Sequence, residues 1–369
     1  MFSVHATQPE HLMTAFLNRI GTAVPPFDIH AAFVETAQHL LPDERSRRLL
    51  RRMAERCGIE RRWSVFEAAG GGGLDRGGFY RWGAFPGTAS RMALYEQHAP
   101  DLAAQAVERL EIGALRSRIT HLIVATCTGF YAPGLDHQLV ERFGLSPSVE
   151  RTVVGFMGCY AAINALKLAR HIVRSEPESV VLTVNLELCT LHLQERPDLE
   201  TVLSFLIFGD GCAAGLVSAE PSGIALDGFR AVVVPGTADQ ITWRIGESGY
   251  DMHLSGAVPL TLAAGLPRAL PAILGGRPAD AIELWAVHPG GRSILDAVEQ
   301  ALALDPERLE ESRAVLRDFG NMSSATVMFV LKRMLDRFRR TGYGGNGDGV
   351  AMAFGPGLTA ETMTFRMAA

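Results

Sequence analysis

The sequence predicts a layered α/β protein built from two related βα halves. Segments with the apolar period of helices alternate along the chain with short β-branched runs, and no low-complexity segment interrupts them. In addition, three landmarks of the first half recur in the same order in the second half. A Pro-Ser-Gly turn lies within residues 218–228 and marks the expected junction. We therefore expect one half over residues 1–220 and the other over residues 221–369.

Each landmark is either a buried strand with a polar residue at its end, a glycine turn that opens a helix, or a Gly-Asp-Gly motif. The strand landmark is Cys127 in the first half and His288 in the second. The helix-opening turn carries Cys159 in the first half and Asn321 in the second, and the Gly-Asp-Gly motifs lie at 209–211 and 347–349. The first two landmarks are 32 positions apart in the first half and 33 positions apart in the second. Because related strand ends face each other across the middle of a duplicated fold, we expect Cys159, His288 and Asn321 to lie close together.

Composition excludes several classes of protein. The 369-residue chain carries a net charge of −5, whereas a general nucleic-acid binder is usually basic. Its five cysteines include no Cys-x-x-Cys pair, which argues for a reducing compartment without disulfides or a metal cluster. Residues 1–10 lack the features of a signal peptide, and no run of eighteen apolar residues occurs. We expect a cytoplasmic protein without an integral membrane segment or a bound metal.

Cys159 is the candidate nucleophile. A β-branched run breaks at Gly155 and Gly158 just before it, and residues with a helical apolar period follow it. The free N–H groups and the dipole at a helix start stabilise a thiolate, so the pattern predicts a lowered pKa for this thiol. The alternative is a cysteine that packs as a small buried hydrophobe.

His288 and Asn321 would complete a specific chemical set around Cys159. A thiolate attacks a thioester carbonyl and holds the acyl group. A histidine hydrogen-bonds or stabilises the thiolate as an ion pair, and an asparagine amide donates to an enolate oxygen at any pH. Together these roles describe a decarboxylative Claisen condensation. The alternatives are a satisfied core histidine at 288 and a helix cap at 321.

These residues and their surroundings resemble the type III polyketide synthases, the chalcone synthase group. The resemblance runs nearly end to end, and its motifs are Gly158-Cys159, His288-Pro-Gly-Gly, Gly320-Asn321-Met-Ser-Ser-Ala, Phe208-Gly-Asp-Gly and Phe354-Gly-Pro-Gly-Leu-Thr. It implies the thiolase fold, a layered αβαβα core, and a homodimer. It also implies acyl-CoA starters and malonyl-CoA extenders with no further cofactor. By the same resemblance, Cys159 holds the acyl group, His288 and Asn321 promote decarboxylation, and Phe208 is the gatekeeper between the CoA tunnel and the cavity.

Departures from the plant enzymes indicate a subgroup. Met252 occupies the position of a second gatekeeper phenylalanine, and Trp243 replaces a glycine. The cavity positions of the plant enzymes that carry small hydroxyl residues correspond here to Cys127, Cys189 and His192. The pattern is similar to bacterial enzymes that extend fatty acyl starters and cyclise the chain to an alkylpyrone or alkylresorcinol. Alternatively, the bulky Trp243 narrows the cavity.

Two other functions stay open from the sequence. A single-condensation β-ketoacyl synthase of the same fold also uses Cys, His and Asn. A catalytically silent acyl-binding paralogue would keep the fold without the reaction.

An arginine-rich segment over residues 45–62 suits phosphate binding. On a helix, Arg48, Arg52 and Arg56 share one face, and guanidinium groups bind phosphate oxygens bidentately. The family resemblance places Arg52 and Arg56 at CoA-binding positions, with Arg48 as compensation for a third position that is Leu49 here. The resemblance also places Ser293 in the CoA-binding set. The alternative is a solvated helix face paired with nearby acids.

Overall fold

The computed structural model describes residues 13–69, 73–341 and 347–368. Residues 1–10, which carry the expectation about a signal peptide, lie outside these ranges. The strands are β1 (Phe16–Ala23), β2 (Phe27–Asp28), β3 (Trp63–Ser64), β4 (His121–Thr126), β5 (Glu150–Gly155), β6 (Val181–Leu188), β7 (Asp210–Ser218), β8 (Gly223–Val233), β9 (Ile241–Gly246), β10 (Gly249–Leu254), β11 (Leu284–Val287), β12 (Asp348–Gly355) and β13 (Thr359–Ala368). The α-helices are α1 (His30–Thr36), α2 (Glu44–Arg56), α3 (Thr88–Glu108), α4 (Leu135–Phe143), α5 (Ala161–Ser175), α6 (Leu199–Ile207), α7 (Val258–Ile273), α8 (Arg292–Leu302), α9 (Glu310–Phe319) and α10 (Thr326–Thr341). The 3₁₀ turns are η1 (Ala37–Leu40), η2 (Gly113–Arg118), η3 (Gly158–Tyr160), η4 (Cys189–His192), η5 (Ala279–Ala281), η6 (Pro306–Leu309) and η7 (Ser323–Ala325).

One long sheet organises the molecule, with the strand order β11-β12-β13-β8-β1-β7-β6-β4-β5. Its two parts repeat the same pairings. In the first part β4 runs parallel to β6, β6 antiparallel to β7, and β7 antiparallel to β1. In the second part β11 runs parallel to β12, β12 antiparallel to β13, and β13 antiparallel to β8. The duplication expected from the sequence is therefore present in the sheet.

One landmark of that duplication was matched wrongly. The Gly-Asp-Gly motif at 209–211 opens β7, whereas the motif at 347–349 opens β12. The counterpart of β12 in the first part is β6, since each runs parallel to the strand that precedes the candidate site. Both glycine-flanked aspartates begin a strand, and this shared position at a strand start explains the similar sequence of the two motifs.

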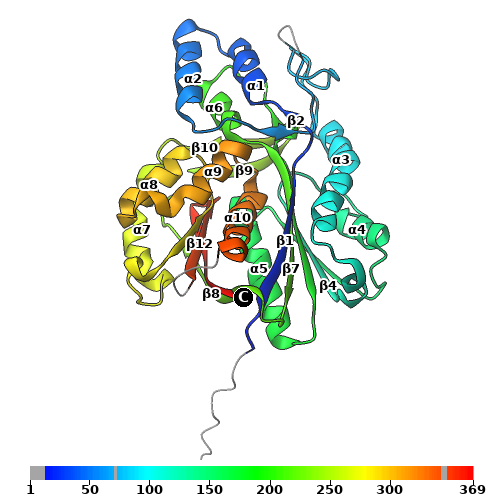
Figure 1. Ribbon diagram of the computed structural model, residues 1–369. Coiled ribbons are helices and arrows are strands. Elements are labelled where there is room, and N and C mark those ends of the chain that lie inside the picture. Colours follow the sequence, from blue (N-terminus) through cyan, green and yellow to red (C-terminus); the bar gives the residue numbers. More distant parts are fainter. Residues whose placement is uncertain (1–12, 70–72, 342–346, 369) are drawn as a thin grey trace, which may run out of the picture.

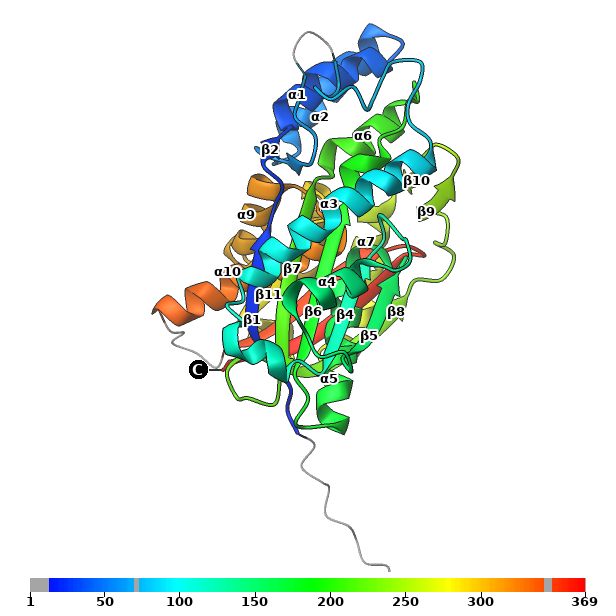
Figure 2. The same ribbon diagram turned by 90° about the vertical axis from the view of Figure 1, so that its right-hand side faces the viewer.

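The helices complete five layers (Figures 1 and 2). The pair α5 and α10 lies between the two parts of the sheet and packs on both, whereas α3 covers one outer face and α7 with α8 covers the other. Alternate residues along each strand face different layers: Ile123 of β4 joins the inner cluster, and Leu122 joins the outer one. The predicted layered αβαβα arrangement is thereby confirmed.

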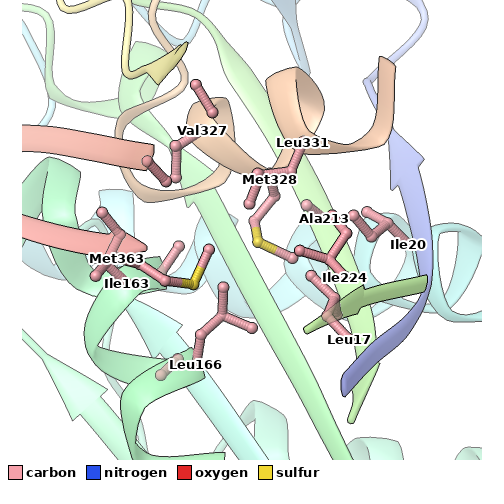
Figure 3. Close-up of a cluster of buried hydrophobic side chains, with 14 of the residues drawn as sticks. Leu17, Ile20, Ile163, Leu166, Ala213, Ile224, Val327, Met328, Leu331 and Met363 are labelled. Carbon is pink, nitrogen blue, oxygen red and sulfur yellow. The ribbon is translucent and has the colours of Figure 1, made fainter. Parts of the chain in front are cut away.

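The inner layer is apolar throughout. Figure 3 shows Ile163 and Leu166 of α5 and Met328 and Leu331 of α10 pointing toward side chains of the flanking strands, and all four are fully buried. The helical period predicted after Cys159 is thus the buried face of α5.

Two insertions interrupt the repeated scaffold. Between β1 and α3 the chain forms α1, α2 and the small sheet β2-β3, which lie at the upper end of the molecule in Figure 1. Between β8 and α7 it forms the hairpin β9-β10. Over the described ranges, every helix is too short or too polar to cross a membrane.

Candidate active site

Cys159 lies in η3, between the end of β5 and the start of α5, as the sequence predicted. The turn depends on Gly158, which has φ of +72°. A Cβ atom at that position would also come within 2.6 Å of Pro356 Cδ, so the turn is closed against the strand connection of the second half. The thiol therefore stands at the junction of the two halves.

The lowered pKa expected for this thiol is wrong for the structure. Burial raises the pKa of Cys159 to about 11, and the negative charge of Glu187 acts in the same direction. Hydrogen bonds from Ser323 and Asn321 lower it, but by less than burial raises it. The raised pKa therefore favours the neutral thiol of Cys159 at neutral pH.

Asn321 occupies the corresponding turn of the second half. It follows Gly320, which has φ of +69°, and it precedes η7 and α10. Its side chain serves two purposes: Oδ1 accepts from the backbone N–H of Ser323 (2.8 Å), whereas Nδ2 donates to the carbonyl of Gly290 (3.2 Å). The amide hydrogen bond to Cys159 adds a third contact. Asn321 is thus a cap at the start of this turn and also a donor into the site.

His288 follows β11 and is 1% exposed. Its backbone N–H donates to Met352 (2.7 Å), but neither ring nitrogen has a hydrogen-bond partner within the described residues. Burial lowers the pKa of His288 to about 3, so the imidazole is neutral. A Cβ at Gly290, whose carbonyl accepts from Asn321, would lie 3.7 Å from His288 Nε2. Contacts therefore link His288 through Gly290 to Asn321, and Asn321 to Cys159.

Cys127 lies at the end of β4, in the position that corresponds to His288, and it is fully engaged. Its backbone N–H donates to Glu187 Oε2 (3.0 Å), and its sulfur lies 3.4 Å from both carboxylate oxygens of Glu187 and 3.5 Å from Ser323 Oγ. Cys189 opens η4 and is also buried. Burial raises the pKa of both thiols well above the usual range.

Glu187 was missed by the sequence reasoning. This fully buried carboxylate accepts from Ser324 Oγ (2.6 Å), Thr128 Oγ1 (2.8 Å) and the backbone of Cys127, and so joins β6, the loop after β4 and η7. Burial raises the pKa of Glu187 to about 7. A lone acid in the apolar run of β6, where all eight residues are buried, was the available signal.

The hairpin β9-β10 forms a wall beside these residues. Trp243 and Met252 are directly paired across the two strands. Trp243 Nε1 donates to the carbonyl of Cys127 (2.7 Å), and its ring meets His192 edge to face at 5.3 Å. His192 stacks on Tyr250 at 4.2 Å. Four of the five predicted cavity residues, Cys127, His192, Trp243 and Met252, are therefore linked by direct contacts or strand pairing.

The hydrogen-bond partners of His192 determine which of its ring nitrogens carries the proton. Nδ1 accepts from the backbone N–H of Tyr250 (3.0 Å), so Nε2 carries the proton and donates to the carbonyl of Thr128 (2.7 Å). Burial lowers the pKa of His192 to about 3. His192 is therefore a neutral side chain that joins the loop after β4 to β10.

Phe208 and Met252 each border a cavity. Phe208 faces an apolar cavity of about 40 Å³, which it shares with Phe33, Phe66 and Phe205. Met252 borders a polar cavity of about 200 Å³ between α6 and β10.

The first part of the arginine-rich segment, up to Arg56, forms α2, whereas Arg61 and Arg62 lie beyond the helix. Arg48, Arg52 and Arg56 are exposed on it, and none of the three forms an ion pair within the described residues. Glu44 pairs instead with Arg51 at 2.8 Å. Ser293 is exposed in the first turn of α8, and the neighbouring Arg292 donates to the carbonyl of Arg56 (3.3 Å). The four predicted CoA-binding residues thus lie on two adjacent helices.

Comparison with known proteins agrees with this geometry. The family models of the chalcone and stilbene synthases match residues 14–221 (N-terminal domain) and 227–369 (C-terminal domain). The chain is 36% identical over 286 residues to the alpha-pyrone synthesis polyketide synthase-like Pks18 of Mycobacterium tuberculosis, which covers 74% of this chain and 72% of that protein. It is also 36% identical over 296 residues to the bisdemethoxycurcumin synthase of Oryza sativa subsp. japonica (75% and 73% covered).

A solved structure shows the same fold. The polyketide synthase PKS-I of the brown alga Ectocarpus siliculosus matches with a TM-score of 0.87 at 29% identity, over 98% of this chain and 100% of that one. Within the described residues, no cluster of His, Cys, Asp or Glu is arranged to hold a metal ion. The chain belongs to the chalcone and stilbene synthase family, and it is a type III polyketide synthase of the thiolase fold, an acyltransferase that catalyses decarboxylative condensation.

Proposed function

We propose that Cys159 accepts an acyl group from an acyl-CoA starter and that His288 and Asn321 drive its iterative extension with malonyl-CoA. The observation that carries this proposal is the unpartnered, neutral imidazole of His288 beside the Asn321 amide and the Cys159 thiol. Buried polar atoms are normally hydrogen-bonded, so free ring nitrogens at this point suit a substrate.

Starter loading needs the thiol proton to move. Because Cys159 is neutral, the neutral His288 takes its proton, and the sulfur attacks the thioester carbonyl of the acyl-CoA. The bond from that carbonyl to the CoA sulfur breaks, and CoA leaves with the proton returned by His288. The acyl group is then held as a thioester on Cys159.

Extension uses the same donors differently. His288 and Asn321 donate to the thioester oxygen of malonyl-CoA, where negative charge develops as the bond to the carboxylate breaks and CO2 leaves. The enolate carbon attacks the acyl carbonyl on Cys159, and the Cys159 sulfur leaves as a thiolate. Reloading of the longer chain onto Cys159 would permit the next round.

The cavity supports an apolar starter. Aromatic and aliphatic side chains line most of the cavity at Phe208, and Trp243 and Met252 form a separate apolar pair on the hairpin β9-β10. Together with the similarity to the alpha-pyrone synthesis protein, this favours a fatty acyl starter and an alkylpyrone or alkylresorcinol product. A flexible thioether at Met252 would leave more room for a chain than an aromatic ring.

CoA phosphates would bind on α2. Arg48, Arg52 and Arg56 are free of acidic partners within the described residues, and Ser293 lies on the adjacent first turn of α8. The polar cavity beside Met252 suits phosphate poorly, because its lining includes the acids Asp198, Glu200 and Asp251. Its basic residues already face those acids: Arg196 pairs with Asp251 at 2.9 Å, and His253 lies 3.9 Å from Glu200. The enzyme would need no cofactor besides its CoA thioester substrates, and we place it in the cytoplasm.

We further propose a homodimer of chains that each contain two functional halves, over residues 1–220 and 221–369. Strand β5 is one edge of the sheet, and Thr152 and Val153 on it are exposed. An exposed edge strand is a natural partner for a second copy of itself. Pairing at β5 would place the Cys159 turns of both copies near the shared interface.

Incubation with malonyl-CoA and starters from acetyl-CoA to palmitoyl-CoA, with products identified by mass spectrometry, tests the proposal. Tri- or tetraketide pyrones or resorcinols support it, and a single β-ketoacyl product would identify a β-ketoacyl synthase instead. Acyl labelling should disappear in Cys159→Ala and persist in Cys57→Ala, a matched control at a partly exposed thiol. Absence of labelling in the unaltered protein would indicate a silent acyl-binding paralogue.

A further inference from the structure

Arg62 is a buried cation with an unusual set of partners. It is 1% exposed and forms no salt bridge within the described residues. Its Nη1 donates to the carbonyls of Phe205 (2.9 Å) and Phe208 (2.5 Å), and its Nε donates to His30 Nδ1 (3.0 Å). Burial lowers the pKa of Arg62 only to about 10, so the side chain stays charged at neutral pH.

The two carbonyls explain why a charge is tolerated there. Phe205 lies in the last turn of α6, where carbonyls have no partner within the helix and the dipole is negative. Arg62 therefore caps the end of α6. The ring of Phe33, 4.7 Å from the guanidinium carbon, adds a cation–π contact.

The capped segment leads directly into the site. Phe208 follows α6 and forms an isolated β-bridge with Asn321: Asn321 N donates to Ile207 O (2.8 Å), and Gly209 N donates to Asn321 O (3.0 Å). Arg62 also lies against Gly320, the residue before Asn321 in the other strand of the bridge. A Cβ at Gly320 would lie 2.8 Å from Arg62 Cγ. One side chain thus contacts both strands of the bridge.

We infer that Arg62 is a positioning residue for decarboxylation, because it holds the Phe208–Asn321 bridge and with it the direction of the Asn321 amide. This inference rests on the proposed role of Asn321. It requires the fork that Nε and Nη1 form, because one ammonium group cannot reach His30 and two carbonyls at once. The third nitrogen, Nη2, has no partner within the described residues. Loss of the fork should therefore impair malonyl decarboxylation and spare acyl loading on Cys159.

Arg91 offers a matched control. It is also fully buried, its Nη1 also donates to two carbonyls, and its Nη2 also lacks a partner within the described residues. Its carbonyls belong to Leu191 and Leu193, in and after η4, away from the bridge. Arg62→Lys and Arg91→Lys therefore make the same chemical change at two differently connected sites.

The experiment measures acetyl-CoA formation from malonyl-CoA and, separately, the rate of Cys159 acylation by a starter. In Arg62→Lys we expect kcat for decarboxylation to fall by about 10- to 100-fold, with KM and the acylation rate within about threefold. In Arg91→Lys the ratio of the two rates should match the unaltered enzyme. Equal losses in both rates for Arg62→Lys, or no loss in either, would overturn the inference.

A milder pair of variants covers the case in which Arg62→Lys does not fold. His30→Asn keeps an acceptor for Arg62 Nε and should preserve decarboxylation, whereas His30→Leu removes the acceptor and should reduce it. Hydrogen exchange of the Asn321 and Gly209 amides gives a readout that is independent of turnover. Exchange about 10-fold faster in His30→Leu than in His30→Asn supports the inference, and equal exchange contradicts it. If the unaltered protein does not decarboxylate malonyl-CoA, the proposed function fails, and amide exchange still decides the role of Arg62.

Discussion

The turns that carry Cys159 and Asn321 are built alike but are used differently. Each begins with a glycine at positive φ, passes through a 3₁₀ turn and opens a central helix. The strand ends beside them differ more. Cys127 is tied to Glu187 and Ser323, whereas its counterpart His288 leaves both ring nitrogens without a partner within the described residues. Cys127 thus belongs to a satisfied polar network that includes Ser323 of the second half, whereas His288 supplies a free imidazole.

This difference shows how a duplicated scaffold acquires one active site. Satisfied groups such as Glu187 fix the geometry, because each of its oxygens accepts hydrogen bonds from separate segments. Unsatisfied groups such as His288 remain available to a substrate. The insertions add a third component, since α2 and the hairpin β9-β10 carry the residues that we assign to substrate recognition.

The largest effect that would test the comparison is expected at Asn321, whose amide donates to Gly290 and to Cys159. Asn321→Ala removes the amide that is directed toward Cys159, and decarboxylation of malonyl-CoA should fall on the order of 10²–10³-fold. Acylation of Cys159 should change little, because His288 remains as its base. Rates of acetyl-CoA formation and of starter labelling check this. Equal losses in both rates would show that Asn321 has no separate role in decarboxylation.

The corresponding strand ends give a direct comparison. His288→Gln removes the base but keeps an N–H donor, and turnover should fall on the order of 10²-fold or more. Cys127→Ser keeps a small polar side chain within reach of Glu187 and should stay within about 10-fold. Steady-state kinetics with one starter measure both variants. A greater loss in Cys127→Ser than in His288→Gln would reverse the assignment of the two halves.

The hydrogen-bond network around Glu187 should contribute to the stability of the fold. Glu187→Gln replaces a carboxyl that is protonated at pH 5 and has one donor with an amide that has two, so that an N–H faces hydroxyl or backbone donors. We expect the free energy of unfolding at pH 5 to fall by about 1–3 kcal/mol. Because the pKa of Glu187 is raised to about 7, the folded wild type retains a proton that the unfolded chain has released, and its stability decreases as pH rises toward 7.

Gln does not titrate, so the difference in unfolding free energy between the wild type and Glu187→Gln should narrow with rising pH. The narrowing should reach about 1.4 kcal/mol per pH unit at its steepest. Urea unfolding at pH 5, 6 and 7 measures it. A difference that is independent of pH would mean that Glu187 titrates alike in the folded and unfolded chain.

The smallest effect is expected in the insertion. Met252→Phe stiffens the wall opposite Trp243 and should change starter preference or product length by a few-fold, while decarboxylation remains unchanged. Product analysis across the starter series checks this. An unchanged product profile would show that Met252 does not line the path of the chain.

The sequence predicted the fold class, the position of Cys159 and the arginine helix, because local period and turn residues determine each of them. It did not predict the raised pKa of Cys159, since burial depends on the second half packing across the turn. Glu187 and Arg62 were missed as site residues for the same reason, because their partners come from distant segments. The two Gly-Asp-Gly motifs, which are not counterparts, show that the same short sequence can begin strands at different places in the sheet.

The position of β1 has a consequence for synthesis of the protein. Residue Ala23 pairs with Cys212, 189 positions later in the chain, and β1 also bridges to β8. At a translation rate of about 5–20 residues per second, the first strand waits roughly 10–40 s for the neighbours that enclose it. During that interval its apolar face is open to other nascent chains. Chaperone dependence and the speed of translation through the first 220 codons should therefore govern the yield of active enzyme.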